Sequence, residues 1–167
     1  MSRTAQIAAM LVLPCIGMGI AERSWALSCL RPSVESSFAA AQASSSIYEM
    51  AVGTFIVAPG EALPPAVTDD PNREPSRIAA RFEGRFATLE GFEQERQVPV
   101  TLELGCTGPW CATVPTGQVL VFLERADDGY VLSEGACPRL MFAANPEKER
   151  QAMACLTDPE ACNASGN

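Results

Sequence analysis

Apolar and polar residues alternate along several short stretches of the chain, which is the pattern of strands whose two faces differ in environment. The alternation covers residues 47–57, 78–89 and 98–104. The strongest strand prediction is the continuous apolar run at 119–123, which begins after Gly117-Gln118. Gly84 interrupts the second stretch and indicates a bulge or a sharp bend. Pro99 lacks an amide donor, so we expect it near the start of its strand or at an edge.

Turn-forming residues separate these strands. Asp127-Asp128-Gly129 predicts a hairpin turn from the strand at 119–123 into another strand at 130–132. Residues 58–75 contain five prolines and predict a long exposed connection. Long loops are either functional or solvated insertions, and a solvated insertion is the favoured interpretation.

Two helices are expected beside the strands. Residues 34–42 place apolar side chains at helical spacing after Ser33, a good N-cap residue. Near the other end, Asn145 is a suitable cap, Pro146 suits the first helical position, and residues 147–156 continue the helix. Short strands with two flanking helices predict a small, mostly β barrel or sandwich.

The N-terminal residues have the three-part pattern of a secretory signal peptide. Arg3 supplies a positive charge, and the apolar stretch at 7–20 is shorter than the ~20 residues of a membrane-spanning helix. Small residues permit cleavage after Ala26 or after Ser28, and we expect the first. The sequence therefore predicts a signal peptide over residues 1–26, a periplasmic or secreted mature protein and no membrane span after cleavage.

The cysteines agree with export. The chain has seven, and Cys15 would leave with the signal peptide. An even set then remains, which in a short exported domain predicts disulfides: Cys29, Cys106, Cys111, Cys137, Cys155 and Cys162.

Spacing narrows the pairing. Cys106 and Cys111 bracket the turn-forming Thr-Gly-Pro-Trp, and the last two cysteines bracket a short C-terminal segment. These two local bonds leave Cys29 for Cys137. A zinc cluster is disfavoured because no pair has the C-x-x-C spacing. Lipidation of Cys29 is disfavoured because Leu27 and the charged residues before it make a weak lipobox.

Composition excludes several functions. The chain has no histidine, which excludes Ser-His-Asp and Cys-His catalytic units and imidazole metal sites. It has 20 acidic and 12 basic residues, a net charge of −8, which argues against nucleic acid or an anionic membrane as a partner. We expect neither a cofactor nor a metal.

A few residues are candidates for chemistry or binding. Glu83, Glu90, Glu93 and Glu95 are close in sequence, as a carboxylate hydrolase would need, although a solvated hairpin explains them better. Trp110 would anchor a partner or pack over its own disulfide, and the sequence leaves both open.

Another candidate is Arg139, which would bind an acidic ligand or lie exposed beside a strand. Asn163-Ala164-Ser165 matches a glycosylation sequon, which matters only in a eukaryotic secretory pathway.

The order of several short motifs resembles the netrin-like module, the domain of tissue inhibitors of metalloproteinases and of related bacterial exported proteins. The motifs span residues 28–142: Ser28-Cys29 with Pro32, Phe38-Ala39, Gly53, Cys111 before Gly117-Gln118-Val119-Leu120-Val121-Phe122, Asp128-Gly129-Tyr130-Val131-Leu132, and Cys137-Pro138-Arg139. The resemblance implies a five-stranded oligonucleotide/oligosaccharide-binding (OB) type barrel over residues 27–142. It also implies a Cys29–Cys137 disulfide, as the spacing does. Residues 143–167 would form a C-terminal helix and a disulfide-closed tail.

The family's inhibitors chelate a protease zinc with the amine and carbonyl of an N-terminal cysteine. Cys29 matches that residue if cleavage falls after Ser28, whereas Arg31 replaces the inhibitors' next cysteine. The sequence therefore favours an exported, non-enzymatic domain that binds a protein or envelope component. The alternative is a metalloprotease-inhibitor-like protein acting through Cys29.

Overall fold

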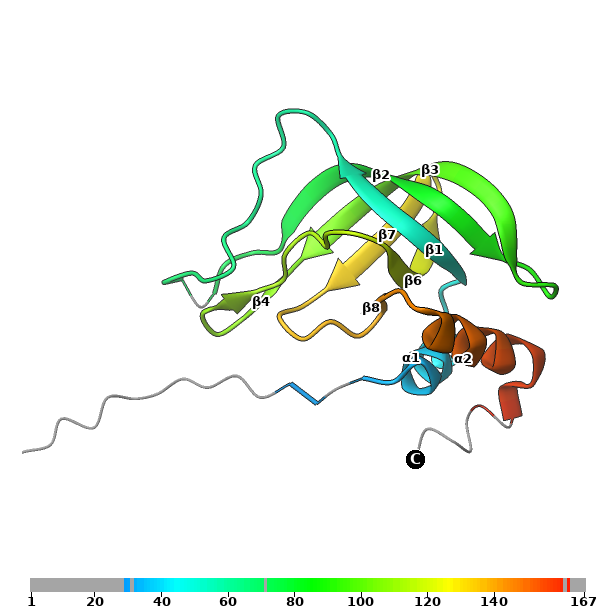
Figure 1. Ribbon diagram of the computed structural model, residues 1–167. Coiled ribbons are helices and arrows are strands. Elements are labelled where there is room, and N and C mark those ends of the chain that lie inside the picture. The colour runs from blue at the N-terminus through cyan, green and yellow to red at the C-terminus, as the bar shows by residue number, and fades with distance from the viewer. Residues whose placement is uncertain (1–28, 31, 71, 161, 163–167) are drawn as a thin grey trace, which may run out of the picture.

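The computed structural model describes residues 29–30, 32–70, 72–160 and 162, so the predicted signal peptide and the sequon lie outside the described residues. In the described part the elements run as follows (Figure 1): α1 (Val34–Ala43), β1 (Tyr48–Val57), β2 (Ser76–Ala87), β3 (Phe92–Leu104), β4 (Cys106–Thr107), β5 (Trp110–Cys111), β6 (Val119–Ala126), β7 (Gly129–Glu134), β8 (Met141–Ala143) and α2 (Pro146–Thr157).

Five strands close into a barrel in the order β1-β2-β3-β7-β6, and β6 pairs back with β1. All of these pairings are antiparallel except that of β3 with β7, which is parallel. The short β8 pairs with β6 beside the end of β7. The prediction of an OB-like five-stranded barrel with two helices is confirmed.

The strands bury one face inside the barrel. In β2, alternate residues such as Ile78 and Phe82 are buried while Arg77 and Arg81 lie on the outer face. This period of two is what a half-buried strand requires. The barrel interior is thus a packed apolar core: Ala51, Ile78, Ala80, Phe82, Phe86, Val98, Val100, Leu102, Leu104, Ala112, Val119, Val121, Leu123, Tyr130 and Leu132.

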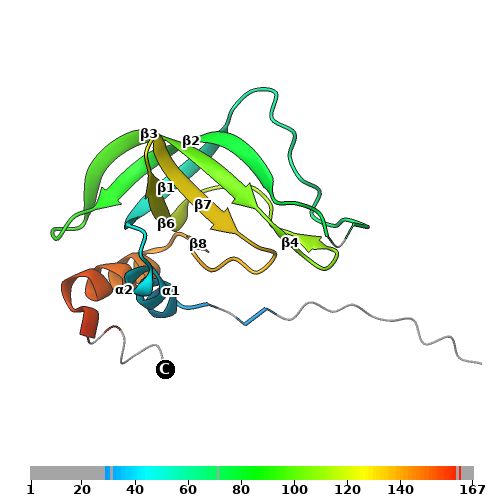
Figure 2. The same cartoon turned by 180° about the vertical axis from the view of Figure 1, so that it is seen from behind.

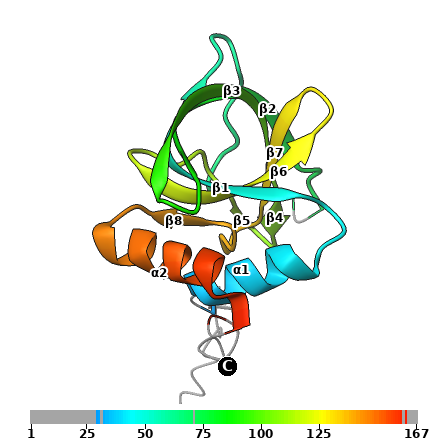
Figure 3. The same ribbon diagram turned by 90° about the vertical axis from the view of Figure 1, so that its right-hand side faces the viewer.

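A second core lies between the barrel and the helices. Met50 and Val52 of β1, with Leu120 and Phe122 of β6, meet residues of both helices there. Strand β6 is therefore buried on both faces, which explains its unbroken apolar run. Figure 3 shows α1 and α2 side by side beneath the barrel.

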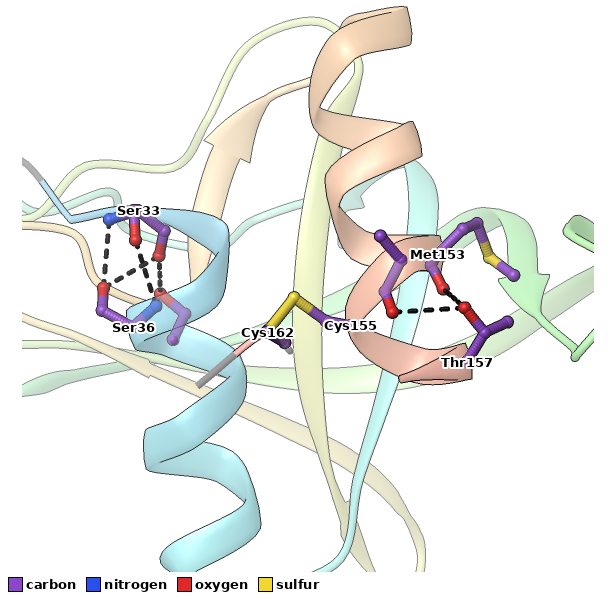
Figure 4. Close-up of a disulfide and its surroundings, with 8 residues drawn as sticks. Ser33, Ser36, Met153, Cys155, Thr157 and Cys162 are labelled. Atoms are coloured by element: carbon purple, nitrogen blue, oxygen red, sulfur yellow. Dashed lines mark hydrogen bonds between the residues drawn. A yellow bond between two sulfur atoms is a disulfide. The ribbon is translucent and has the colours of Figure 1, made fainter. Parts of the chain in front are cut away.

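Local capping sets where the helices begin. Ser33 and Ser36 form a reciprocal capping box at the start of α1, and the Asn145 side chain accepts from the Lys148 amide at the start of α2. Figure 4 shows the first of these caps and the Cys155–Cys162 disulfide. Both predicted N-caps are confirmed.

All three predicted disulfides are present: Cys29–Cys137, Cys106–Cys111 and Cys155–Cys162. The first spans 108 residues and so restricts a long loop of the unfolded chain, worth about 4–5 kcal/mol in the chain-entropy description. Three disulfides are typical of a protein that folds in an oxidising compartment outside the cytoplasm.

Two glycines let β1 and β2 coil tightly. Gly53 pairs with Gly84, and a Cβ on Gly84 would lie 2.3 Å from the carbonyl oxygen of Val52. Both positions must therefore lack a side chain. Of the two alternatives predicted at Gly84, the bulge is wrong because the pairing is regular there, and the register shift falls at Phe86/Ala87. The sharp bend is not contradicted.

Strand β3 begins at Phe92, earlier than the predicted start at residue 98, because its first half pairs with β2 alone. Pro99 accordingly lies inside the strand, and its expected place near the strand start is wrong. Strand β7 pairs with β3 only from Val100 onward, so the second edge of β3 is still unpaired at Pro99. The edge interpretation of Pro99 therefore explains how the strand tolerates it.

Candidate functional site

Aromatic and aliphatic side chains pack inside the barrel, and a charged cluster lies at one end of it. At this end, the Glu49 carboxylate accepts from Arg96 at 2.8 Å, from the Tyr130 hydroxyl at 3.0 Å and from Arg125. The Arg96 guanidinium also lies 4.1 Å from the centroid of the Phe86 ring. We call this group the Glu49 end.

The arginines beside Glu49 lower the pKa of its carboxyl. Burial alone would raise the pKa of this carboxyl, but hydrogen bonds from Arg125, Arg96 and Tyr130 outweigh burial and hold the pKa below its usual value of 4.5. Both guanidiniums are engaged by the same carboxylate. The Glu49 end is therefore a closed structural cluster.

Tyr130 of the Glu49 end lies near the start of β7, and a second acid, Glu134, is the last residue of the same strand. Its hydrogen-bond partners are backbone amides. The Glu134 side chain is 5% exposed, and its two oxygens accept from the backbone amides of Arg139 at 2.8 Å and Leu140 at 2.7 Å. Burial raises the pKa of Glu134, and the two amide hydrogen bonds offset this only in part. We call this group the Glu134 end. Sequence analysis missed it because no motif surrounds Glu134.

The long connection at 58–75 is attached to the disulfide-closed hairpin β4–β5. The Thr68 amide donates to the Pro109 carbonyl at 2.8 Å, and the Cys111 amide donates to the Ala66 carbonyl at 3.0 Å. Val67 thereby forms an isolated antiparallel bridge with Trp110. Figures 1 and 2 show the connection arching from β1 and returning beside β4.

Three apolar side chains are exposed on this assembly, with exposed fractions of 59% for Leu63, 52% for Val67 and 38% for Trp110. We call them the Trp110 platform. Adjacent strand residues point to opposite faces, and Cys111 is buried, so Trp110 faces away from the side on which Cys111 packs. This geometry favours the partner-anchor interpretation of Trp110 over packing against its own disulfide.

A groove of 540 Å³ lies between α1 and the segment that follows β7, and we call it the α1 groove. Arg139, Ser36, Ser44 and Thr107 are among its lining residues. Thr107 is the cross-strand neighbour of Trp110, so the groove begins beside the Trp110 platform. The structure thus brings two of the sequence candidates, Trp110 and Arg139, to one side of the molecule.

The four glutamates do not form one site. Glu83 and Glu95 line a shallow hollow of 490 Å³ on the outer face of β2 and β3, where Glu83 pairs with Arg81 at 2.7 Å. Glu90 lies in the turn between these strands, and Glu93 is exposed near the start of β3. Their exposure is that of a solvated hairpin.

Cys29 is exposed, as is the following Leu30, and the disulfide to Cys137 attaches it beside the α1 groove. Among the described residues, no group of three or more Cys, Asp or Glu side chains is arranged to hold a metal ion. Likewise, no helix in the described ranges has the length and apolar character to cross a membrane.

The fold and its bonds define a class: a disulfide-closed OB-like barrel with two helices packed on one side. Comparison with known proteins adds no closer relationship, because no family model, curated protein or solved structure matches the chain.

Proposed function

We propose that this protein is an exported, non-enzymatic domain that binds a protein partner through the Trp110 platform. The observation that carries the proposal is the exposure of Val67 and Trp110 on backbone held by a disulfide and two hydrogen bonds. Apolar and aromatic side chains on a rigid base lose little conformational entropy on binding. Trp is also among the residues that most often dominate interface energies.

We expect the partner to pack on the side chains of the Trp110 platform and not to pair as an added strand with the backbone of Val67. The outward edge at Val67 is short, Pro64 and Pro65 before it lack amide donors, and Asp69 and Asp70 after it add charge. Such residues block the pairing of an added strand.

Export is part of the proposal. It supposes a signal peptide over residues 1–26, cleaved near Ala26–Ser28, and a periplasmic or secreted mature chain. The three disulfides support it. The netrin-like relationship is also a proposal: the barrel order and the Cys29–Cys137 bond agree with what the motifs imply.

The direct test places a photo-crosslinking amino acid at Val67 in the full-length chain expressed in its own host. The matched control position is Leu89, an apolar residue that is 71% exposed in the β2–β3 turn, at the opposite end of the molecule from β4 (Figures 1 and 2). We expect one defined adduct at Val67 that Trp110→Ala abolishes, and none at Leu89. Equal adducts at both positions, or adducts unaffected by Trp110→Ala, contradict the proposal.

A second candidate function is metalloprotease inhibition through Cys29. The favouring observation is that Cys29 and Leu30 are exposed while the disulfide to Cys137 fixes their position. Inhibition needs a free amine on Cys29, hence cleavage after Ser28. N-terminal sequencing of the exported protein, followed by assay against zinc endopeptidases, decides this: a mature chain beginning at Leu27 removes the candidate.

A further inference from the structure

The segment that carries Arg139 is held at every residue. Cys137 is bonded to Cys29, and Pro138 has a restricted backbone. The Arg139 amide donates to Glu134, and its carbonyl accepts from the Ser37 hydroxyl. At the next residue, the Leu140 amide donates to Glu134 and its carbonyl accepts from the Phe122 amide at 2.8 Å.

Glu134 is the group that fixes this backbone. One carboxylate, buried to 5% exposure, accepts from two consecutive amides. An ionised acid is costly to bury, so its use at this place serves the geometry of residues 139 and 140. The result is an Arg139 side chain that begins from a rigid base.

The Arg139 side chain itself is available. It is exposed, lines the α1 groove, and forms no ion pair or side-chain hydrogen bond with any described residue. The Arg139 guanidinium attracts the Glu134 carboxylate and lowers the pKa of that acid, but the two Glu134 oxygens accept their hydrogen bonds from backbone amides. By contrast, Arg96 and Arg125 of the same barrel are both taken up by Glu49.

We propose that Arg139 in the α1 groove binds a carboxylate of the partner, an Asp or Glu side chain in an extended segment whose apolar residue rests on the Trp110 platform. The groove leads to the platform through Thr107, so one segment can contact both. The guanidinium geometry favours a two-bond contact with a carboxylate. The inference rests on the proposed function, since it specifies the chemistry of that partner.

The net negative charge of the protein favours a ligand with a single carboxylate over a polyanion. The chain carries a net charge of −8, so an extended polyanion such as nucleic acid is repelled overall. A partner segment with one acidic side chain beside an apolar one can bind Arg139 without bringing further negative charge to the protein. The apolar platform next to the groove matches such a segment.

The test selects linear peptides from a random phage-displayed library on the exported, disulfide-bonded protein. Selections run in parallel on the wild type, Arg139→Glu and Trp110→Ala. The matched control is Arg150→Glu, at an exposed arginine of α2 that lines neither the groove nor the platform.

We expect the wild type and Arg150→Glu to enrich an apolar residue followed by Asp or Glu. Arg139→Glu should replace the acid by Lys or Arg and weaken the wild-type peptide by about tenfold or more. An unchanged acidic motif on Arg139→Glu, or no acidic motif on the wild type, overturns the inference. If Trp110→Ala alone removes binding, the proposed function stands and the inference fails; if peptides ignore both residues, both fail.

Discussion

A glutamate lies near each end of β7: the half-buried Glu49 of β1 contacts Tyr130 at the start, and the buried Glu134 is the last residue of the strand. The two acids have different kinds of partner. Glu49, at the start, is neutralised by two arginines and the Tyr130 hydroxyl. Glu134, at the end, accepts hydrogen bonds from two backbone amides and is also attracted by the Arg139 guanidinium. The first pKa is lowered and the second is raised. The opposite directions follow from two differences together: Glu134 is more deeply buried, and Glu49 receives hydrogen bonds from two guanidiniums where Glu134 receives them from backbone amides.

The consequences for function also differ. At the Glu49 end the acid engages the arginines, and the cluster closes the barrel. At the Glu134 end the acid accepts hydrogen bonds from the backbone, and the Arg139 side chain, which attracts this acid without forming a hydrogen bond to it, lines the α1 groove. A closed cluster and an open cation thus lie at the two ends of the same strand.

The largest effect is expected on removing the Glu134 carboxylate, which accepts from the two backbone amides. Glu134→Ala leaves the amides of Arg139 and Leu140 without partners, and we expect a loss of about 2–4 kcal/mol in the free energy of unfolding. Urea denaturation measures it. Ser133→Ala, at the neighbouring residue, removes one exposed hydrogen bond to Glu103 and is the control, which should change little. A loss for Glu134→Ala no greater than that of the control would show that the two hydrogen bonds do not hold this end.

Removing the acid at the other end should cost less. Glu49→Ala leaves Arg96 partly buried and unpaired, but the side chains of Glu49 and Arg96 are 21% and 30% exposed, so water compensates in part. After that discount we expect about 1–2 kcal/mol by urea denaturation. Glu83→Ala, which breaks the exposed pair with Arg81, is the control. Equal losses for the two variants would mean that Glu49 acts only as a surface residue.

The free energy of unfolding should change with pH in opposite directions for the two acids. The changes should be smaller than those of the alanine variants, because protonation leaves the side chain in place. The lowered pKa of Glu49 means that its stabilisation is present above pH 4.5 and is lost as pH falls through the folded-state pKa. The raised pKa of Glu134 means the reverse: its ionisation destabilises the fold, and this cost disappears as pH falls toward 4.5.

Stability of the wild type relative to Glu49→Gln should therefore shrink below pH 4.5, and stability relative to Glu134→Gln should grow as pH falls toward 4.5. Unfolding midpoints across this range measure both differences. Parallel pH profiles for the two variants would refute the contrast.

The smallest effect is expected at the exposed edge of the Glu49 end. Arg125 has a side chain that is 56% exposed, and Glu49 keeps Arg96 and Tyr130 without it. Arg125→Ala should shift the unfolding midpoint slightly in low salt and not measurably in high salt. A large shift that persists in high salt would show that Arg125, and not Arg96, holds the acid.

Much of the fold was predictable because local signals agree with the tertiary structure. Ser33 and Asn145 cap the helices they were expected to cap, and Asp127-Asp128-Gly129 forms the turn between β6 and β7. The cysteine spacings led to the observed disulfides because two pairs are local and the third follows by elimination. The start of β3 was missed since its first residues, at 92–97, are mostly polar.

The candidate site was only half visible. Trp110 and Arg139 stood out as residue types, but nothing in the sequence joins a residue of β5 to one 29 positions later in the connection between β7 and β8. Val67 was hidden in a connection interpreted as a solvated insertion, because its pairing with Trp110 is a long-range contact. The role of Glu134 depends on two amides five and six residues further along a turn, which no periodicity reveals.

The sequence by itself determined the elements, the disulfide pairing and the exclusion of histidine chemistry, because caps, alternation, spacing and composition are local or countable properties. Only the tertiary structure decided which side chains meet. Barrel closure brings β1 to β6 and so gives Glu49 its ion pair with Arg125, while Arg96 reaches the same carboxylate from β3. The return of the chain after β7 places Arg139 in the groove beside the platform. Contacts between residues so far apart in the sequence depend on the path of the whole backbone.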